Sequence, residues 1–234
     1  LLHSKRWCVH LLSKWVRGRL MKLTYREDSH LYGWSGAFGR NIIFTLTLIA
    51  LGLSLYLQDR ALGTAFADVS AADHIGYMLR VTARIAFILL LLAMIARPFR
   101  QLTGMGSELL RHRRYLGLAM AFVHTVHFGY VVAYLQTSGE PLEMVTLIFG
   151  GLAFLLTWIM AVTSNNTSQR ALKAWWRRIH TLGIYYVWLI FMNTFIGVLL
   201  ATSDPLYVGI VAVGLVAVSL RMAVFLRQRF SRTA

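Results

Sequence analysis

Two histidines stand inside long apolar segments of this chain, where an ionisable side chain needs a partner. His127 lies thirteen residues beyond the pair Arg113 and Arg114, and His180 follows the sequence WWRR by two residues. The partners that suit a neutral imidazole in hydrocarbon are a buried polar group and a metal, including the iron of a haem. These two segments are therefore the first candidates for a cofactor region.

A third histidine, His124, lies three residues before His127 and so on nearly the same helical face. One helix seldom supplies both axial ligands of a haem, because the ligands approach the iron from opposite sides. The candidate partners of His124 are a second cofactor, a haem propionate, or a hydroxyl such as that of Thr125 or Thr157.

Two arginines also lie within an apolar segment. Arg80 and Arg84 are one helical turn apart, and the long side chain of Arg80 can reach outward to the membrane surface. Two guanidinium groups at this spacing suit the two carboxylates of a haem. The alternative is that they pair with the acidic residues Asp59, Asp68 or Asp73.

The depths of the two principal histidines differ. At 1.5 Å per residue, His127 lies about 20 Å beyond its arginine pair and His180 about 3 Å beyond its own. We therefore do not expect them to be axial ligands of one haem. The residue level with His127 on the later segment is Asn193, whose amide is a poor iron ligand but can bond a propionate or a quinone carbonyl.

The composition places these residues in a membrane. The 234-residue chain is 57% hydrophobic and 14% charged, with a mean hydropathy of +0.59, which is typical of an integral membrane protein. Its net charge of +15 comes from residues between the apolar segments, which indicates anchoring at the membrane surface and no nucleic-acid partner. We expect an all-α membrane protein whose six transmembrane helices form a bundle, at about residues 41–57, 76–96, 115–135, 142–163, 179–201 and 206–226.

The charges between these segments predict the topology. Strongly basic connections alternate with neutral or acidic ones, so the positive-inside rule places both termini in the cytoplasm of a multi-pass protein of the bacterial inner membrane. Residues 1–40 are expected to form a basic amphipathic helix on the membrane surface, with docking to a protein as the alternative. Residues 41–227 form the transmembrane domain, and 228–234 a basic tail. No soluble segment is large enough for a nucleotide cofactor, so flavin or nicotinamide chemistry would come from another chain.

Three stretches of the sequence resemble a known family. The stretches RPFRQLTG (97–104), RRYLGLAMAFVHTVH (113–127) and TSNNTSQRALKAWWRRIH (163–180) resemble the ferric reductase-like transmembrane domain. The likeness is strongest to the haem-binding membrane subunit of periplasmic methionine sulfoxide reductase systems. It implies six helices that hold b-type haem through histidines on the third and fifth spans. It also implies that electrons pass from an inner donor, such as a quinol or a flavoprotein, to an outer acceptor.

By this resemblance, His127 matches the haem histidine of the third span and His180 the first histidine of the fifth. The second histidine of the fifth span falls at Asn193, and an inner histidine of the wider family falls at Arg113. Each of the two haem positions thus lacks one expected ligand. Three outcomes follow: a substitute ligand, a five-coordinate haem, or loss of the cofactor. The candidate substitute ligands are His124, His74 and His112.

The function predicted from the sequence is therefore a b-type haem subunit that relays electrons in a larger redox complex. If the chain is part of an enzyme, it is an electron-transfer subunit of an oxidoreductase. The lipid bilayer and a redox or membrane-complex protein are its expected partners. The alternatives are a cofactor-poor structural or assembly subunit with the same fold, and a quinone-binding subunit without haem.

Overall fold

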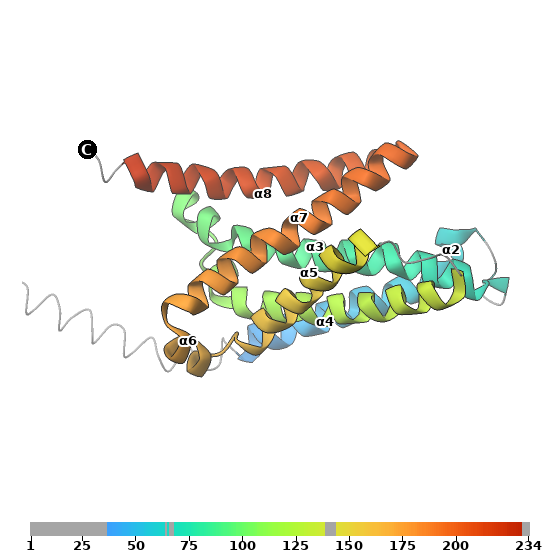
Figure 1. Cartoon of the computed structure of the whole chain (residues 1–234), viewed down its shortest axis with the longest axis horizontal. Coiled ribbons are helices and arrows are strands. Elements are labelled where there is room, and N and C mark those ends of the chain that lie inside the picture. The colour runs from blue at the N-terminus through green and yellow to red at the C-terminus, as the bar shows by residue number, and fades with distance from the viewer. Residues whose placement is uncertain (1–36, 64, 66–67, 139–143, 231–234) are drawn as a thin grey trace, which may run out of the picture. The chain divides into compact units, whose positions relative to one another are not determined.

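The computed structural model describes residues 37–63, 65, 68–138 and 144–230. The chain divides into two compact units, Leu1–Ile42 and Ile43–Ala234, and the candidate site residues all belong to the second. The expected surface helix within residues 1–40 lies almost entirely outside the described residues, as does the end of the basic tail. The first described helix is Ala37–Tyr56. The others are α2 (Gln58–Leu62), α3 (Ala71–Thr103), α4 (Ser107–Ser138), α5 (Met144–Val162), α6 (Asn166–Leu172), α7 (Ala174–Thr202) and α8 (Pro205–Phe230) (Figure 1).

The architecture is that of an all-α multi-pass membrane protein. Helix Ala37–Tyr56, α3, α4, α7 and α8 are each long and apolar enough to cross a bilayer. A sixth span is present if Leu147–Val162 and α6, which meet at an angle of 104°, are counted together. The prediction of an all-α membrane fold is therefore confirmed, and the number of spans among the described residues is five or six.

The long helices extend beyond the apolar segments that predicted them. Helix α3 has 33 residues and continues through Arg97 and Pro98 to Thr103, where the predicted segment ended at residue 96. Hydropathy marks the hydrocarbon thickness, whereas a helix ends where its backbone is capped. At this end Gly104 takes a φ of 76°, a left-handed conformation that suits glycine, and its N–H bonds the carbonyl of Arg100.

The α6–α7 corner is closed by local polar contacts. The side chain of Asn165 caps α6 by accepting a 2.7 Å hydrogen bond from the backbone N–H of Ser168. Lys173 joins α6 to α7 with φ 46° and ψ −111°, a backbone conformation that an L-residue adopts only under strain. This corner turns the chain so that α7 starts with its basic sequence WWRR at the end that carries Arg113 and Arg114.

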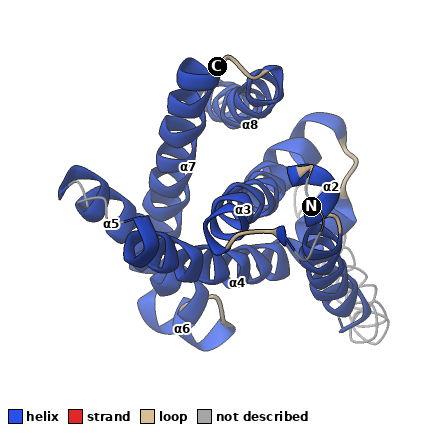
Figure 2. Ribbon diagram, turned by 90° about the vertical axis from the view of Figure 1, so that its right-hand side faces the viewer, coloured by secondary structure: helices blue, strands red, loops and turns tan. Residues whose placement is uncertain are grey.

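Within the second unit, α3 is the central helix. It packs along α4 and also contacts α7 and α8, while α5 bridges α4 and α7 (Figure 2). Phe87 of α3 packs against Phe191 and Phe195 of α7 in the buried core, with tilted and edge-on rings. Helices α4 and α7 run in the same direction (Figure 1) and are not a closely packed pair, so side chains and a cavity occupy the space between them.

Candidate functional site

His127 of α4 is held by Thr82 of α3. Its Nδ1 lies 3.0 Å from Oγ1 of Thr82, a side chain that is fully buried. The hydroxyl of Thr82 donates its single hydrogen to the carbonyl of Met78 at 2.6 Å. Thr82 must then accept from the Nδ1–H of His127.

From this pair of contacts we assign the Nδ1–H tautomer to His127. With its proton on Nδ1, a neutral imidazole carries its free lone pair on Nε2. A metal-binding histidine usually has this arrangement, in which the second ring nitrogen donates to an oxygen that fixes the ring. The ring of His127 is thus prepared to act as an Nε2 ligand.

His124 is buried beside His127, and the two rings are stacked with centroids 6.0 Å apart. Its ring also packs against Phe154 of α5 and Phe191 of α7. Its Nδ1 is buried and has no hydrogen-bond partner among the described residues. Neither Thr125 nor Thr157, two of the candidate partners, is a partner of this nitrogen, and both hydroxyls bond carbonyls of their own helices.

Arg84 points toward the start of α8. It donates a 2.9 Å hydrogen bond to the hydroxyl of Tyr207, and its guanidinium lies 5.1 Å from the centre of that ring. The Nε of Arg84 is buried without a partner among the described residues, and Arg84 forms no ion pair with an acidic residue there. Arg80 is exposed, as expected for a side chain that reaches outward.

Asn193 lies on the exposed side of α7, and Phe191, Met192 and Phe195 are the buried residues around it. Phe191, two residues earlier, is the α7 side chain that contacts His124. Two residues correspond to about 200° around a helix, so these two side chains lie on nearly opposite faces. Asn193 therefore does not face His127, although the two residues were predicted to lie at the same depth in the membrane.

His180, near the start of α7, contacts Thr163 and Trp176. Its Nε2 lies 3.0 Å from Oγ1 of Thr163, and that hydroxyl donates to the carbonyl of Ile159 at 2.6 Å. Thr163 therefore accepts from Nε2–H of His180. The ring is stacked on Trp176 at 4.2 Å, and the indole N–H of Trp176 bonds the Thr163 carbonyl at 2.8 Å. In this state the nitrogen that usually binds haem iron is occupied.

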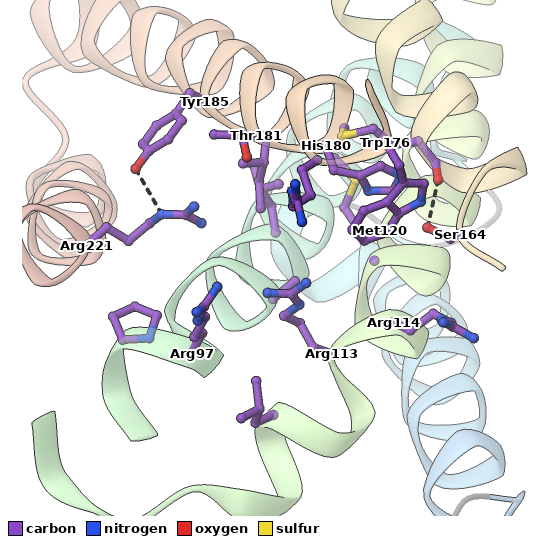
Figure 3. Close-up of a pocket in the computed structure, with 18 of the residues that line it drawn as sticks. Arg97, Arg113, Arg114, Met120, Ser164, Trp176, His180, Thr181, Tyr185 and Arg221 are labelled. Carbon is purple, nitrogen blue, oxygen red and sulfur yellow. Dashed lines mark hydrogen bonds between the residues drawn. The ribbon is translucent and has the colours of Figure 1, made fainter. Parts of the chain in front are cut away.

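A cavity of about 970 Å³ lies at this end between α3, α4, α5, α7 and α8. His180, Arg113 and Met120 line it (Figure 3), together with residues from all five helices. The structure thus brings together His180 and Arg113, the two residues that occupy the inner haem position in the family resemblance.

A separate polar cluster lies at the opposite end of α3. The Nδ1–H of His74 donates to Oε1 of Gln58 at 2.7 Å, and Nε2 of His74 lies 3.4 Å from the hydroxyl of Tyr130. Asp59 of α2 has a buried carboxylate oxygen without a partner among the described residues. A second cavity of about 650 Å³ is lined by His74, Gln58 and Asp59 together with mainly apolar side chains.

Thr82 and Thr163 are the functional residues that the sequence analysis missed. Each lies in an apolar segment and forms the hydrogen bond that sets the protonated nitrogen of a histidine. Counting depth along antiparallel segments would have placed Thr82 near His127, but threonines in membrane helices are common and usually bond their own backbone. No group of three or more His, Cys, Asp or Glu side chains in the described part of the chain is arranged to hold a metal ion.

Comparison with known proteins identifies the family. The chain is 36% identical over 160 residues to the protein-methionine-sulfoxide reductase heme-binding subunit MsrQ of Xanthomonas oryzae pv. oryzae (strain MAFF 311018), which covers 63% of the chain and 70% of that protein. The subunit of the same name from Xanthomonas campestris pv. campestris (strain B100) is 35% identical over 159 residues, covering 62% and 70%. That from Ralstonia nicotianae (strain ATCC BAA-1114 / GMI1000) is 32% identical over 154 residues, covering 59% and 69%.

No family model matches the chain. No solved structure matches it either. The match to the curated proteins extends over more than two thirds of their length at above 30% identity. This chain therefore belongs to the MsrQ family of protein-methionine-sulfoxide reductase heme-binding subunits.

Proposed function

We propose that this chain is a b-type haem subunit that relays electrons within a larger membrane redox complex. The proposal rests on the His127–Thr82–Met78 arrangement, in which the Nδ1–H tautomer that we assign leaves Nε2 of a half-buried histidine unprotonated. The names of the related proteins agree with it, because they are described as heme-binding subunits of protein-methionine-sulfoxide reductase.

His127 fits a haem because its Nε2 is a free donor for iron and its ring cannot turn without losing the bond to Thr82. Arg84, two residues after Thr82, lies on nearly the opposite face of α3 and points to Tyr207 of α8. Its Nε–H is buried without a partner among the described residues, so it is a candidate for a propionate only where the carboxylate reaches that face. Arg80, on the same helix, is the second candidate for a propionate. A haem held there supplies one-electron transfer to the complex.

The second ligand is the part of the site that departs from the family pattern. Asn193 lies on a face of α7 turned away from His127, and its amide is a poor iron ligand. His180 uses its Nε2 to bond Thr163 in the described arrangement. Ligation by His180 requires the Thr163 bond to break, and His124 shares the helix of His127. We propose His127 as the principal ligand and His180 as the second candidate.

The topology and partners complete this proposal. The α3–α4 turn, the start of α7 and the end of α8 are rich in basic residues and lie at the same side of the helices. The positive-inside rule favours the cytoplasm for this basic side of a bacterial inner-membrane protein. We propose residues 41–227 as the transmembrane domain, residues 1–40 as a basic membrane-surface segment and residues 228–234 as a basic cytoplasmic tail. In this proposal electrons enter from and leave to other molecules of the complex.

The proposal is tested by the absorption spectrum of the purified chain before and after reduction with dithionite. We expect a Soret band and, after reduction, a sharp α band. A protein that is folded and free of both bands would contradict the proposal and favour the cofactor-poor scaffold.

The outer cluster supports a second candidate function, a quinone site. His74 and Gln58 place paired polar groups beside an apolar cavity of about 650 Å³, within the size range of small-molecule sites. A quinone head group could exchange hydrogen bonds with these two side chains. Binding of a short-chain quinone that His74→Phe abolishes, while His112→Phe leaves it unchanged, would support this role. Equal binding by both variants would contradict it.

A further inference from the structure

Three arginines from three helices point into the large cavity. Arg97 of α3, Arg113 of α4 and Arg221 of α8 all line it, and Figure 3 shows their guanidinium groups turned toward a common space opposite His180. Arginines that only mark the membrane surface would point outward. Arg114 also lines the cavity, but its guanidinium turns away and donates to Oδ1 of Asn166 at 2.7 Å.

The charges of these arginines are not balanced within the cavity. Arg97 and Arg221 are close enough to Arg113 for both to repel it electrostatically. No Asp or Glu lines the cavity in the part of the chain that the structure describes. Like charges gathered in a partly buried space are costly unless an anion joins them.

Arg221 is held in place by its neighbours. Its Nε donates to the hydroxyl of Tyr185 at 3.0 Å, its guanidinium lies 4.7 Å from the centre of the Tyr185 ring, and one terminal nitrogen is 3.4 Å from the carbonyl of Met94. These contacts use part of the guanidinium and leave the other terminal nitrogen for a ligand. A preorganised guanidinium of this kind suits the tetrahedral oxygens of a phosphate.

The walls of the cavity define the rest of the ligand. Beyond the arginines the lining combines polar side chains, among them Gln101, Thr181 and Gln228, with apolar ones, which include Leu90, Ala93, Met120, Ile184 and Phe225. We propose that the cavity binds an anionic phospholipid, with its phosphate between Arg97, Arg113 and Arg221 and an acyl chain along these apolar side chains. The lipid would fill the space between α4 and α7 at their basic end. This proposal does not depend on a haem at His127.

The test is native mass spectrometry of the full chain, purified in detergent and depleted of lipid, during titration with phosphatidylglycerol or phosphatidylcholine. We expect one phosphatidylglycerol to bind at least about tenfold more tightly than phosphatidylcholine. Arg97→Gln should weaken phosphatidylglycerol about tenfold, and Arg97→Gln with Arg221→Gln about a hundredfold. The matched control is Arg100→Gln, one turn from Arg97 on α3 and outside the cavity lining, which should change the affinity less than about twofold.

Equal losses in the cavity variants and the control would overturn the proposal, because the arginines would then attract lipid only as a diffuse charge. The single Arg97→Gln variant changes an exposed side chain, so it keeps the test decisive if the double variant does not fold. Competition by glycerol phosphate as strong as that by the lipid would also overturn it and assign the site to a soluble phosphate.

Measuring the haem content of the same variants distinguishes this lipid site from the proposed haem site. If Arg97→Gln with Arg221→Gln lowers the haem content and Arg100→Gln does not, the arginines hold propionates and the lipid assignment is wrong. We expect unchanged haem content in both. Conversely, His127→Ala should lose haem absorbance and keep its affinity for phosphatidylglycerol, so each proposal can fail without the other.

Discussion

Replacing Thr82 by valine tests the feature that singles out His127 as a ligand. Valine has nearly the shape of threonine, so the buried packing between α3 and α4 is kept while the hydroxyl is lost. The Nδ1–H of His127 then loses its acceptor at 3.0 Å, and the carbonyl of Met78 loses its donor at 2.6 Å. The imidazole becomes free to rotate and to exchange its proton between the two nitrogens.

The size of the effect follows from the role of the second ring nitrogen. Removing the partner that orients a metal-binding histidine lowers metal affinity by about 10- to 100-fold, which corresponds to roughly 1.4–2.7 kcal/mol. Loss of the Nδ1 bond also makes Nε2 less basic, which stabilises ferric iron less and raises the reduction potential. In the protein without haem, a membrane hydrogen bond of this kind contributes about 0.6 kcal/mol, so the fold should persist.

The assay is titration of the haem-free protein with haemin, followed at the Soret band, together with potentiometric titration of the bound haem. Thr47→Val is the matched control, because Thr47 is also buried and its hydroxyl bonds only the carbonyl of Ile43 on its own helix. We expect weaker binding and a higher potential for Thr82→Val alone. Identical affinity and potential in the two variants would refute the assignment of the Nδ1–H tautomer.

Three further predictions concern the stability of the purified protein, measured as its Tm in detergent. Gly214→Ala places a methyl group against the sulfur of Met192 between α7 and α8, so it should destabilise the protein by about 1–3 kcal/mol; an unchanged Tm would show that these helices separate easily. Lys173→Gly should raise the Tm, because it removes backbone strain of about 1–3 kcal/mol at the α6–α7 corner; a lower Tm would mean that the lysine side chain is needed there. Tyr207→Phe removes the acceptor of the Arg84 guanidinium and should cost about 1–3 kcal/mol; no loss would mean that water or lipid replaces the hydroxyl.

Hydropathy predicted most of the fold because a membrane helix must be apolar over the full thickness of the hydrocarbon. It placed five spans within a few residues of the helices that contain them. It did not predict the α6–α7 corner, where local contacts of Asn165 and the unusual backbone of Lys173 turn the chain by an angle that apolar residues do not encode. It also missed the polar ends of α3 and α4, where the helices continue past the apolar segments.

The candidate site was predicted in part. Depth counting predicted different levels of the membrane for His127 and His180, and the structure gives the two histidines different partners, Thr82 of α3 and Thr163 just after α5. It also made Asn193 level with His127, but depth gives no information on which way a side chain faces around its helix. The cavity arginines were visible as surface charge only, because their convergence depends on how α3, α4 and α8 pack.

The role of His127 is tested most directly by the haem content of His127→Ala, measured as the pyridine haemochrome per chain beside His180→Ala and the unmodified protein. We expect His127→Ala to lose the haem held at α4 together with its reduced α band. We expect His180→Ala to keep that haem, because Nε2 of His180 bonds Thr163. A folded His127→Ala protein with full haem content and an unchanged spectrum would contradict the assignment of His127 as the principal ligand.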